Sequence, residues 1–362
     1  MGNNEIIDQR IIAYGSLITP YHLLQNVPMS EKAMETVLIG RKNIENILKG
    51  EDPRKIIITG PCSIHDPEAA KEYSNRARDL SEKVSDQFLI IMRMYFEKPR
   101  TTIGWKGLIY DPNLDGSNDM NKGLHLSREI LLHNAEIGLP SATEYLEAIT
   151  PQYNSDLISW AAIGARTVES PQHRQLASGL SMPVGFKNST QGDIGVAVDA
   201  IISARKGHSF LSINEYGIPS IVSTSGNPYS HLVLRGGNGE PNYTEKEVKK
   251  AQELLEKAKL PPKVVIDCSH GNSSKDYKKQ PEVFEDVNRQ IVDGNNSIVG
   301  IMFESNIKAG NQKIPSNLKG FDRTTLEYGL SATDGCIDWK TTELLVMDAY
   351  KTLSRTIVPV TK

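Results

Sequence analysis

Short apolar runs alternate with amphipathic stretches along most of the chain. The run KIIITGP at 55–61 precedes the stretch 66–84, where Asp66 is a good N-cap and Pro67 takes the first helical position. We expect strands at 55–61, 88–95, 139–145, 163–169, 182–188, 231–237, 263–270 and 297–305. We expect helices between them, at 66–84, 121–138, 150–160, 171–179, 193–205, 244–258 and 278–293. Eight buried strands separated by helices predict a parallel sheet closed into a (β/α)8 barrel.

Two segments fall outside this alternation. The runs SFLSI and SIVSTSG flank NEYGIP, and we interpret the pair as a β-hairpin inserted before the sixth strand. The stretch 30–50 predicts a helix with Ser30 as its cap and Gly50 as its stop. We therefore divide the chain into an N-terminal extension, 1–50, and a barrel, 51–362. A barrel does not require the extension, which we expect to serve as an interface or in regulation.

Composition narrows the class of protein. The chain has 362 residues, a net charge of −3, 38% hydrophobic and 23% charged residues, an ordinary globular profile. No apolar run reaches the ~18 residues of a membrane span, and the N-terminus lacks the apolar region of a signal peptide. Three cysteines suit a reducing compartment. These features lead us to expect a cytoplasmic protein without a membrane partner. We expect no nucleic-acid partner, because a pI near 6.3 is unlike that of a general nucleic-acid binder.

The residues at and after the predicted strand ends form two sets. Barrel active sites lie at the C-terminal ends of the strands. One set is cationic: Arg93, Lys98, Arg100, Arg166, Lys187 and Arg235. The other set carries a thiol, an imidazole and carboxylates: Cys62, His270, Glu304 and Asp334. Any one of these alone is more often a surface or packing residue, but their convergence on one barrel mouth changes that interpretation.

The two sets predict two kinds of ligand. Six cations at one mouth would repel one another unless an anion neutralised them, and Arg suits bidentate contacts with phosphate and carboxylate. We therefore expect a polyanionic substrate. Mixed sulfur, nitrogen and oxygen donors suit a divalent transition ion such as Mn, Fe, Co or Zn.

Long ordered motifs carry a family resemblance. They are GPCSIHD, MRMYFEKPRTTIGWKGL, SWAAIGARTVESPQHR, PVGFKN, LRGG, DCSHGNSSKDYKKQ, ESNIKAGNQ and SATDGCI. Together they resemble 3-deoxy-D-arabino-heptulosonate 7-phosphate (DAHP) synthase, class I, of the short bacterial and yeast-type branch. The motifs run from residue 60 to 340, and the likeness extends into the N-terminal segment.

The resemblance implies a reaction and site roles. Phosphoenolpyruvate condenses with D-erythrose 4-phosphate to give DAHP and phosphate, which commits carbon to the shikimate pathway and aromatic amino acid biosynthesis. By resemblance, Cys62, His270, Glu304 and Asp334 bind the metal. The phosphoenolpyruvate-binding residues would be Arg93, Lys98, Ala165, Arg166, Lys187 and Arg235. Arg100 and Thr101 would bind erythrose 4-phosphate. The proton-transfer group stays open between a metal-bound water, Glu144 and Lys98.

The resemblance also implies control by an aromatic amino acid in a homodimer or homotetramer. The positions that resemble the effector pocket are Asp8, Tyr145, Glu147, Pro151, Gln152, Ser181 and Ser212. Asp8 or Glu147 would pair with the effector's ammonium and Pro151 would cover its ring, although these positions also suit ordinary surface and helix-start residues. Ser212 is larger than Gly, which favours phenylalanine over tyrosine and leaves tryptophan open.

Three other functions are weighed against this one. The related 3-deoxy-octulosonate 8-phosphate synthase takes a five-carbon aldose phosphate, but the KPRTT loop and the extension favour the four-carbon substrate. A non-catalytic sensor of aromatic metabolites could lose its metal ligands, yet all four are present. A generic metal aldolase would not need so many phosphate-facing cations.

Overall fold

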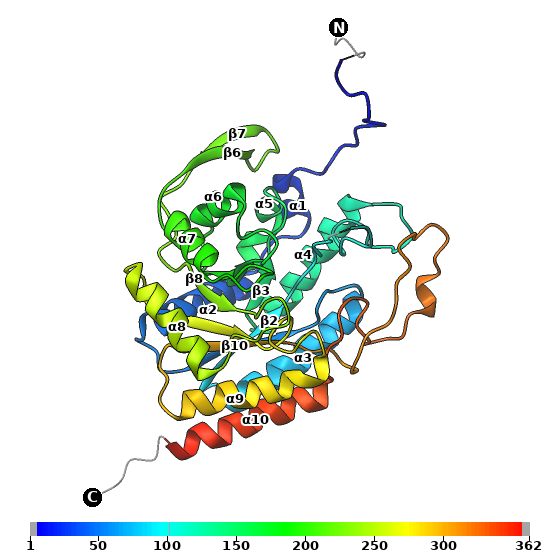
Figure 1. Ribbon diagram of the computed structural model, residues 1–362. Helices are drawn as coiled ribbons and strands as arrows, with labels where there is room; N and C mark the ends of the chain where they lie inside the picture. The colour runs from blue at the N-terminus through cyan, green and yellow to red at the C-terminus, as the bar shows by residue number, and fades with distance from the viewer. Residues whose placement is uncertain (1–5, 101, 357–362) are drawn as a thin grey trace, which may run out of the picture.

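Eight parallel strands close into a barrel, as the sequence predicts. The computed structural model describes residues 6–100 and 102–356 (Figure 1). Around the barrel the strands follow the order β1-β10-β9-β8-β5-β4-β3-β2, and each neighbouring pair is parallel. Their bounds are β1 Lys55–Gly60, β2 Phe88–Arg93, β3 Ser141–Glu144, β4 Trp160–Ile163, β5 Val184–Lys187, β8 His231–Leu234, β9 Val264–Asp267 and β10 Ile298–Glu304.

Helices surround the barrel, and a helix follows each of its eight strands in the chain. Their bounds are α3 Pro67–Val84, α4 Met120–Glu136, α5 Pro151–Asn154, α6 Pro171–Gly179, α7 Gly195–Ala204, α8 Glu245–Lys257, α9 Gln280–Val292 and α10 Trp339–Thr356. Short 3-10 turns lie at η1 Ser155–Leu157, η2 Tyr277–Lys279 and η3 Arg323–Thr325. The Asp66 side chain caps α3 by accepting from the backbone N–H groups of Glu68 and Ala69, as predicted.

Two parts of the sequence-based assignment need correction. The fourth strand is Trp160–Ile163 and not 163–169, because the buried run WAAI pairs with β3 and β5 while Arg166 lies in the turn that follows. The expected helix 150–160 is only α5 followed by η1. The eighth helix, α10, was not predicted; it packs against α9 and α3.

The N-terminal extension contains α1 Pro20–Asn26 and α2 Glu31–Lys49. The predicted cap and stop of α2 are confirmed: Ser30 accepts from the Ala33 N–H, and Gly50 has the left-handed φ of 80°. Ile44 and Ile47 of α2 pack into one core cluster with inward residues of the strands, so α2 closes the N-terminal end of the barrel. The division at residue 50 stays a prediction.

The inserted hairpin lies where the sequence predicts it, between α7 and β8. It consists of β6 Ser209–Ile213 and β7 Pro219–Ser223, an antiparallel pair outside the barrel (Figure 1). Its turn meets the extension, because Tyr21 N–H donates to the Glu215 carbonyl at 2.8 Å and the Tyr21 ring lies 5.4 Å from that of Tyr216. None of the helices in the described part of the chain is both long and apolar enough to cross a membrane.

Candidate active site

Side-chain alternation along the strands brings charged residues to the barrel mouth. Successive residues of a strand point to opposite faces, so residues two apart share a face. Ile91, Val233 and Met302 belong to the apolar interior of the barrel. Two positions further along the chain stand Arg93 and Glu304, at the ends of their strands, and Arg235, directly after β8; all three continue the inward row into the mouth. Lys187 and Asp267 follow Gly185 and Val265 in the same way.

Arg93, Lys187, Arg235 and Glu304 line one cavity of about 330 Å³ at the mouth. All ten residues predicted for the metal and for phosphoenolpyruvate line it: Cys62, Arg93, Lys98, Ala165, Arg166, Lys187, Arg235, His270, Glu304 and Asp334. Arg100 lies beside this cavity at the surface, where its Nε donates to the Trp105 carbonyl at 2.8 Å. Thr101 lies outside the described residues.

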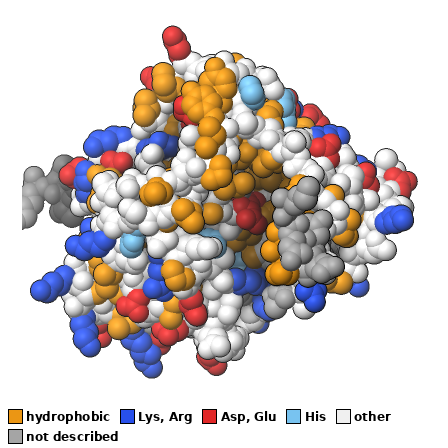
Figure 2. All heavy atoms as spheres, turned by 90° about the horizontal axis from the view of Figure 1, so that it is seen from above, with side chains coloured by type: hydrophobic (Ala, Val, Ile, Leu, Met, Phe, Trp, Pro, Cys, Tyr) orange, Lys and Arg blue, Asp and Glu red, His pale blue; other side chains and the backbone are white. Residues whose placement is uncertain are grey.

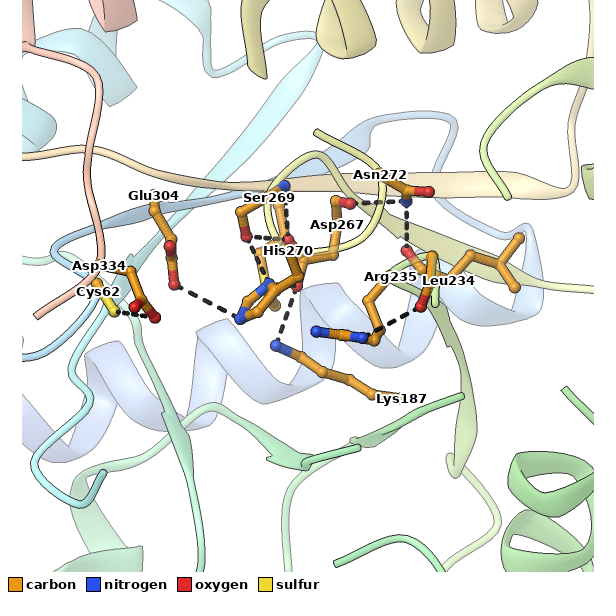
Figure 3. Close-up of polar contacts among 12 residues, drawn as sticks. Cys62, Lys187, Leu234, Arg235, Asp267, Ser269, His270, Asn272, Glu304 and Asp334 are labelled. Carbon is orange, nitrogen blue, oxygen red and sulfur yellow. Dashed lines mark hydrogen bonds and ion pairs between the residues drawn. The ribbon is translucent and has the colours of Figure 1, made fainter. Parts of the chain in front are cut away.

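Three of the four predicted metal ligands converge closely. Single donor atoms of Cys62, Glu304 and Asp334 all lie within 4.8 Å of one another. The Cys62 thiol lies 3.4 Å from Asp334 Oδ2 (Figure 3). Burial raises the pKa of the Cys62 thiol to about 11, and the Glu304 carboxylate adds to the shift. A thiol in this setting becomes a thiolate ligand only if a cation compensates the charge, which is what a divalent ion supplies.

The fourth predicted ligand, His270, lies next to this group, and its second ring nitrogen contacts Asp267 and Ser269. Its Nε2 is 3.8 Å from Glu304 Oε1, while its Nδ1 is 3.0 Å from Asp267 Oδ2 and 2.7 Å from Ser269 Oγ (Figure 3). Metal-binding histidines are commonly oriented by a carboxylate on the second ring nitrogen. The arrangement therefore fits a histidine that offers Nε2 to a metal.

Lys98 places a positive charge between two of the predicted metal ligands, Cys62 and Asp334. Its Nζ lies 2.8 Å from Cys62 Sγ and 2.8 Å from Asp334 Oδ2. Burial acts to lower the pKa of Lys98, but the neighbouring Cys62 and Asp334 hold it above its usual value. This corner of the cavity therefore favours a cation even before a metal is considered.

The other cations of the mouth differ in whether a carboxylate balances them. Arg93 pairs with Glu304 at 3.2 Å, and Lys187 pairs with Asp267 at 3.0 Å. Arg166 and Arg235 have no carboxylate within ion-pair distance among the described residues. Burial lowers the pKa of Arg235 and the Arg166 charge acts in the same direction, although Asp267 opposes it. These two guanidiniums are thus the part of the mouth where an added anion would neutralise the most charge.

The comparisons with known proteins agree with this geometry. The DAHP synthetase I family model matches residues 26–347. The chain belongs to the DAHP synthetase I family. It is 52% identical to the Phe-sensitive phospho-2-dehydro-3-deoxyheptonate aldolase of Escherichia coli K12, over 94% of this chain and 95% of that protein. It is 47% identical to the Tyr-sensitive protein of the same organism, over 98% of this chain and 96% of that protein.

A solved structure supports the same family. The phospho-2-dehydro-3-deoxyheptonate aldolase of Francisella tularensis SCHU S4 superposes with a TM-score of 0.91 at 48% identity, covering 95% of this chain and 98% of that one. This member of the DAHP synthetase I family is therefore an enzyme that makes DAHP on a (β/α)8 barrel.

The structure separates the residues predicted for the effector of this enzyme. Tyr145, Glu147, Pro151 and Gln152 lie on one stretch from the end of β3 to the start of α5. Asp8 lies in the N-terminal segment, which runs away from the barrel, and its Oδ1 accepts from the Tyr14 hydroxyl at 3.0 Å (Figure 1). Ser181 precedes β5, and Ser212 lies on β6. The effector set stays a prediction.

Several residues that line the cavity of the enzyme, or that contact its lining, had no role in the sequence-based prediction. Asp267 balances Lys187 and orients His270, and its inward position two residues after Val265 was a signal that could have identified it. Tyr95 supports two cations with its ring, 3.9 Å from the Arg93 guanidinium and 5.9 Å from Lys187 Nζ. Glu97 and Lys275 also line the cavity, and their loops carry no periodic signal.

Proposed function

We propose that this chain condenses phosphoenolpyruvate with D-erythrose 4-phosphate to give DAHP and inorganic phosphate, the first step of the shikimate pathway. The observation that carries the proposal is a thiol, an imidazole and two carboxylates beside a ring of cations in one cavity. The aldolase names of the relatives support the same reaction. The three cysteines are free and buried, which suits the cytoplasm that we propose as the compartment.

The metal site would use Cys62, His270, Glu304 and Asp334. Their mixed donors fit Mn, Fe, Co or Zn better than Mg or Ca, which prefer all-oxygen ligation. When bound, a divalent ion supplies a Lewis acid that polarises the aldehyde carbonyl of the aldose. The thiol, carboxylates and imidazole are already close together, so the chain's own packing supports this assignment.

The cations would bind and orient phosphoenolpyruvate. Arg166 and Arg235, which have no carboxylate at ion-pair distance in the described part of the chain, would hold the phosphate together with Lys187 and the Ala165 N–H. Arg93 and Lys98 would face the carboxylate. C3 of phosphoenolpyruvate then attacks the aldehyde carbon, water adds to C2, and phosphate leaves with cleavage of the C–O bond. Fixed cations at the phosphate oxygens stabilise the charge that builds there.

Two further roles concern the aldose phosphate and the proton transfers. Arg100 and Thr101 would bind the phosphate of erythrose 4-phosphate. Glu144 and Lys98 are the side chains proposed for proton transfer. Glu144 is buried at the cavity, and Gly164 leaves space for it, because an added Cβ there would lie 2.2 Å from Glu144 Oε1. Gly164→Ala would therefore displace this carboxyl.

We further propose that an aromatic amino acid inhibits the enzyme and that the enzyme self-associates. The E. coli relatives are named Tyr-sensitive and Phe-sensitive, which supports inhibition in this chain. On the hairpin, Leu211 and Ile221 are paired in register and are 84% and 77% exposed. Figure 2 shows apolar side chains gathered around a hollow on the face seen from above. A homodimer or homotetramer that covers the hairpin would bury such side chains.

A phosphate-release assay with two aldoses tests the proposed function. The metal-loaded protein should release phosphate from phosphoenolpyruvate with erythrose 4-phosphate and should give DAHP by mass spectrometry. Arabinose 5-phosphate, the five-carbon alternative, should support at most a small fraction of that rate. A preference for the five-carbon aldose would identify the octulosonate-type reaction instead. Absence of turnover with either aldose would favour a sensor.

A further inference from the structure

Glu97 is a buried carboxyl at the catalytic cavity to which the chemistry above gives no role. It follows β2, precedes Lys98 in the chain, lines the cavity and is 2% exposed. Among the described residues, no cationic side chain lies within ion-pair distance of it. A carboxyl buried without a cation requires hydrogen bonds to offset the loss of water.

Two hydrogen bonds tie Glu97 to one short stretch of chain. The Leu146 N–H donates to Glu97 Oε2 at 3.2 Å, and the Thr150 hydroxyl donates to Glu97 Oε1 at 3.2 Å. Thr150 is the residue before α5, yet its side chain makes no capping hydrogen bond to that helix. The hydroxyl is directed to Glu97 instead. Glu97 therefore fastens the loop after β2 to the stretch 146–150.

The outer side of that stretch meets the extension and the predicted effector residues. Glu147 lies between the two donors, and Pro151 and Gln152 follow Thr150 directly. Helix α5 packs against α1, and the Tyr153 hydroxyl donates to the Ile18 carbonyl at 2.8 Å. A ligand or partner that moves α5 would therefore move the donors that hold Glu97.

On its other side, Glu97 is connected through the chain to the predicted metal ligands. Lys98 is the next residue, and its ammonium contacts Cys62 and Asp334. Its N–H donates to the Lys106 carbonyl at 2.8 Å, and a Cβ added at Gly107 would lie 2.1 Å from the Phe96 carbonyl oxygen, so this part of the loop is tightly packed. Because this part of the loop is tightly packed, a shift of the Glu97 carboxyl also displaces Lys98.

We propose that Glu97 is a positioning residue that couples the stretch 146–150 to Lys98 and Arg100, and so links the predicted effector site to the metal and aldose side of the cavity. This inference rests on the function proposed above. The proposal predicts a selective defect. Loss of the contact should weaken the use of erythrose 4-phosphate and the response to an effector, and should leave phosphoenolpyruvate binding nearly intact.

The protonation of Glu97 gives the proposal a pH signature. Burial raises the pKa of Glu97 to about 8, with the charge of Glu147 acting in the same direction. The other titratable groups that face it are Tyr145 and Tyr110, with Lys98 adjacent in the chain. As the pH rises through about 8 the carboxyl ionises and accepts more strongly from Leu146 and Thr150. Positioning should therefore tighten over that range.

The test compares matched variants of the full-length, metal-loaded protein. Glu97→Gln keeps the size and replaces one acceptor oxygen by a donor, whereas Thr150→Val removes only the hydroxyl. We expect each to raise KM for erythrose 4-phosphate by about three- to tenfold, with KM for phosphoenolpyruvate within about twofold of wild type. Thr150→Ser keeps the hydroxyl and should therefore have the wild-type KM for both substrates. Glu253→Gln on exposed α8 is the control for loss of a surface charge.

The double variant Glu97→Gln, Thr150→Val decides whether the two residues act through one contact. The double should be no worse than the stronger single variant, because the shared interaction can be lost only once. Wild type should show KM for erythrose 4-phosphate falling as pH rises through 8, and Glu97→Gln should lack that component. Whichever of phenylalanine, tyrosine and tryptophan inhibits wild type, its half-inhibitory concentration should be higher for each single variant than for wild type.

Three results would overturn the coupling. These are additive effects in the double variant, equal increases in KM for both substrates, or unchanged kinetics and inhibition in variants that melt at the wild-type temperature. If Glu97→Gln does not fold, the Thr150→Val and Thr150→Ser pair carries the same test. If wild type makes no DAHP, the proposed function fails first; if wild type makes DAHP and Glu97→Gln equals it, only the coupling fails.

Discussion

The two ends of the barrel interior use the same strands for opposite purposes. At the end closed by α2, Trp160 fills the interior against Gly185, where an added Cβ would lie 2.4 Å from the indole. The indole N–H donates to His231 Nε2 at 3.1 Å. Lys187 at the end of β5 and Arg235 directly after β8 face the cavity. Neutral packing at one end gives way to charge at the other within a few residues.

At the closed end, the polar groups of Trp160 and His231 find hydrogen-bond partners within the protein. At the mouth, part of the positive charge is not balanced by a carboxylate in the described part of the chain. The indole N–H can only donate, so His231 accepts at Nε2 and donates from Nδ1 to the Tyr229 carbonyl at 2.9 Å. At the mouth, Arg166 and Arg235 lack carboxylate partners among the described residues. One end therefore contributes to folding, and the other holds charge for a ligand, as expected for the two ends of such barrels. Changes at the two ends should affect different measurements.

Removing both unbalanced guanidiniums should give the largest effect. We expect Arg166→Ala combined with Arg235→Ala to lower kcat/KM for phosphoenolpyruvate by about a thousandfold, because each charge-assisted contact with a phosphate contributes ~2 kcal/mol. The thermal midpoint should stay equal or rise, since the two cations no longer repel. Kinetics and melting of one preparation check both effects. A large loss of stability would mean that the mouth also carries the fold.

Acid should destabilise the closed end through His231. Burial lowers the pKa of His231 to about 4, whereas an unfolded histidine titrates near ~6.5. The unfolded chain binds more protons between these values, so the native state loses ~3 kcal/mol as pH falls from above 6.5 to below 4.

The variant His231→Gln isolates this contribution. Its free energy of unfolding, from urea titrations at several pH values, should fall less steeply on acidification than that of wild type. Its kcat/KM at pH 7.5 should stay within about twofold of wild type, because the residue is remote from the mouth. Parallel stability curves for the two proteins would show that His231 takes up its proton at the same pH in the folded and unfolded states, which would contradict the lowered pKa.

Arg93→Lys tests geometry at the mouth at constant charge. Arg93 contacts Glu304 at 3.2 Å and places its guanidinium 3.9 Å from the Tyr95 ring centre. A lysine keeps the charge but loses the planar fork, so we expect kcat/KM for phosphoenolpyruvate to fall about tenfold. Circular dichroism should be unchanged. Wild-type kinetics in this variant would argue against a role for Arg93 in gripping the substrate carboxylate.

Changes to the regulatory residues should have the smallest effects on the uninhibited rate and on stability, because these residues lie outside both ends of the barrel interior. Deleting residues 1–12 should weaken inhibition by an aromatic amino acid by roughly five- to a hundredfold, the range of a coupling free energy of ~1–3 kcal/mol. Uninhibited activity should persist if the oligomer survives. Inhibition curves for the three amino acids on Ser212→Gly test the preference for phenylalanine. An unchanged preference removes only the argument about ring size.

Most of the barrel could be predicted from the sequence because buried strands and capped helices carry local signals. FLIIMR is continuously apolar up to its arginine, and Asp66–Pro67 marks the start of α3. The fourth strand was misplaced because β4 is only four residues long and runs into a turn, and because IGARTVE also contains β-branched residues, which favour a strand. Pairing with β3 and β5, which is non-local, decides the position.

The candidate site also contains residues that local patterns predict and residues that only non-local contacts bring into place. Residues at strand ends, such as Lys187 and Glu304, follow from the two-residue alternation. The contacts of Lys98 do not, because they join the loop after β2 to Asp334, 236 residues away. The Glu97–Thr150 contact spans 53 residues and has no periodic signature. Loop contacts of this kind depend on the whole fold and were beyond sequence reasoning.

The central claim is that the condensation is catalysed in the cavity at the barrel mouth and requires one divalent ion, which Cys62, His270, Glu304 and Asp334 would bind. The most direct measurement is a titration of chelator-treated protein with Mn²⁺, in which bound metal per chain and the rate of DAHP formation are determined in the same samples. The rate should rise in proportion to occupancy and saturate at one ion per chain, and Cys62→Ala should bind the ion at least about tenfold more weakly. A full rate in metal-free protein, or unchanged binding in Cys62→Ala, would contradict the account.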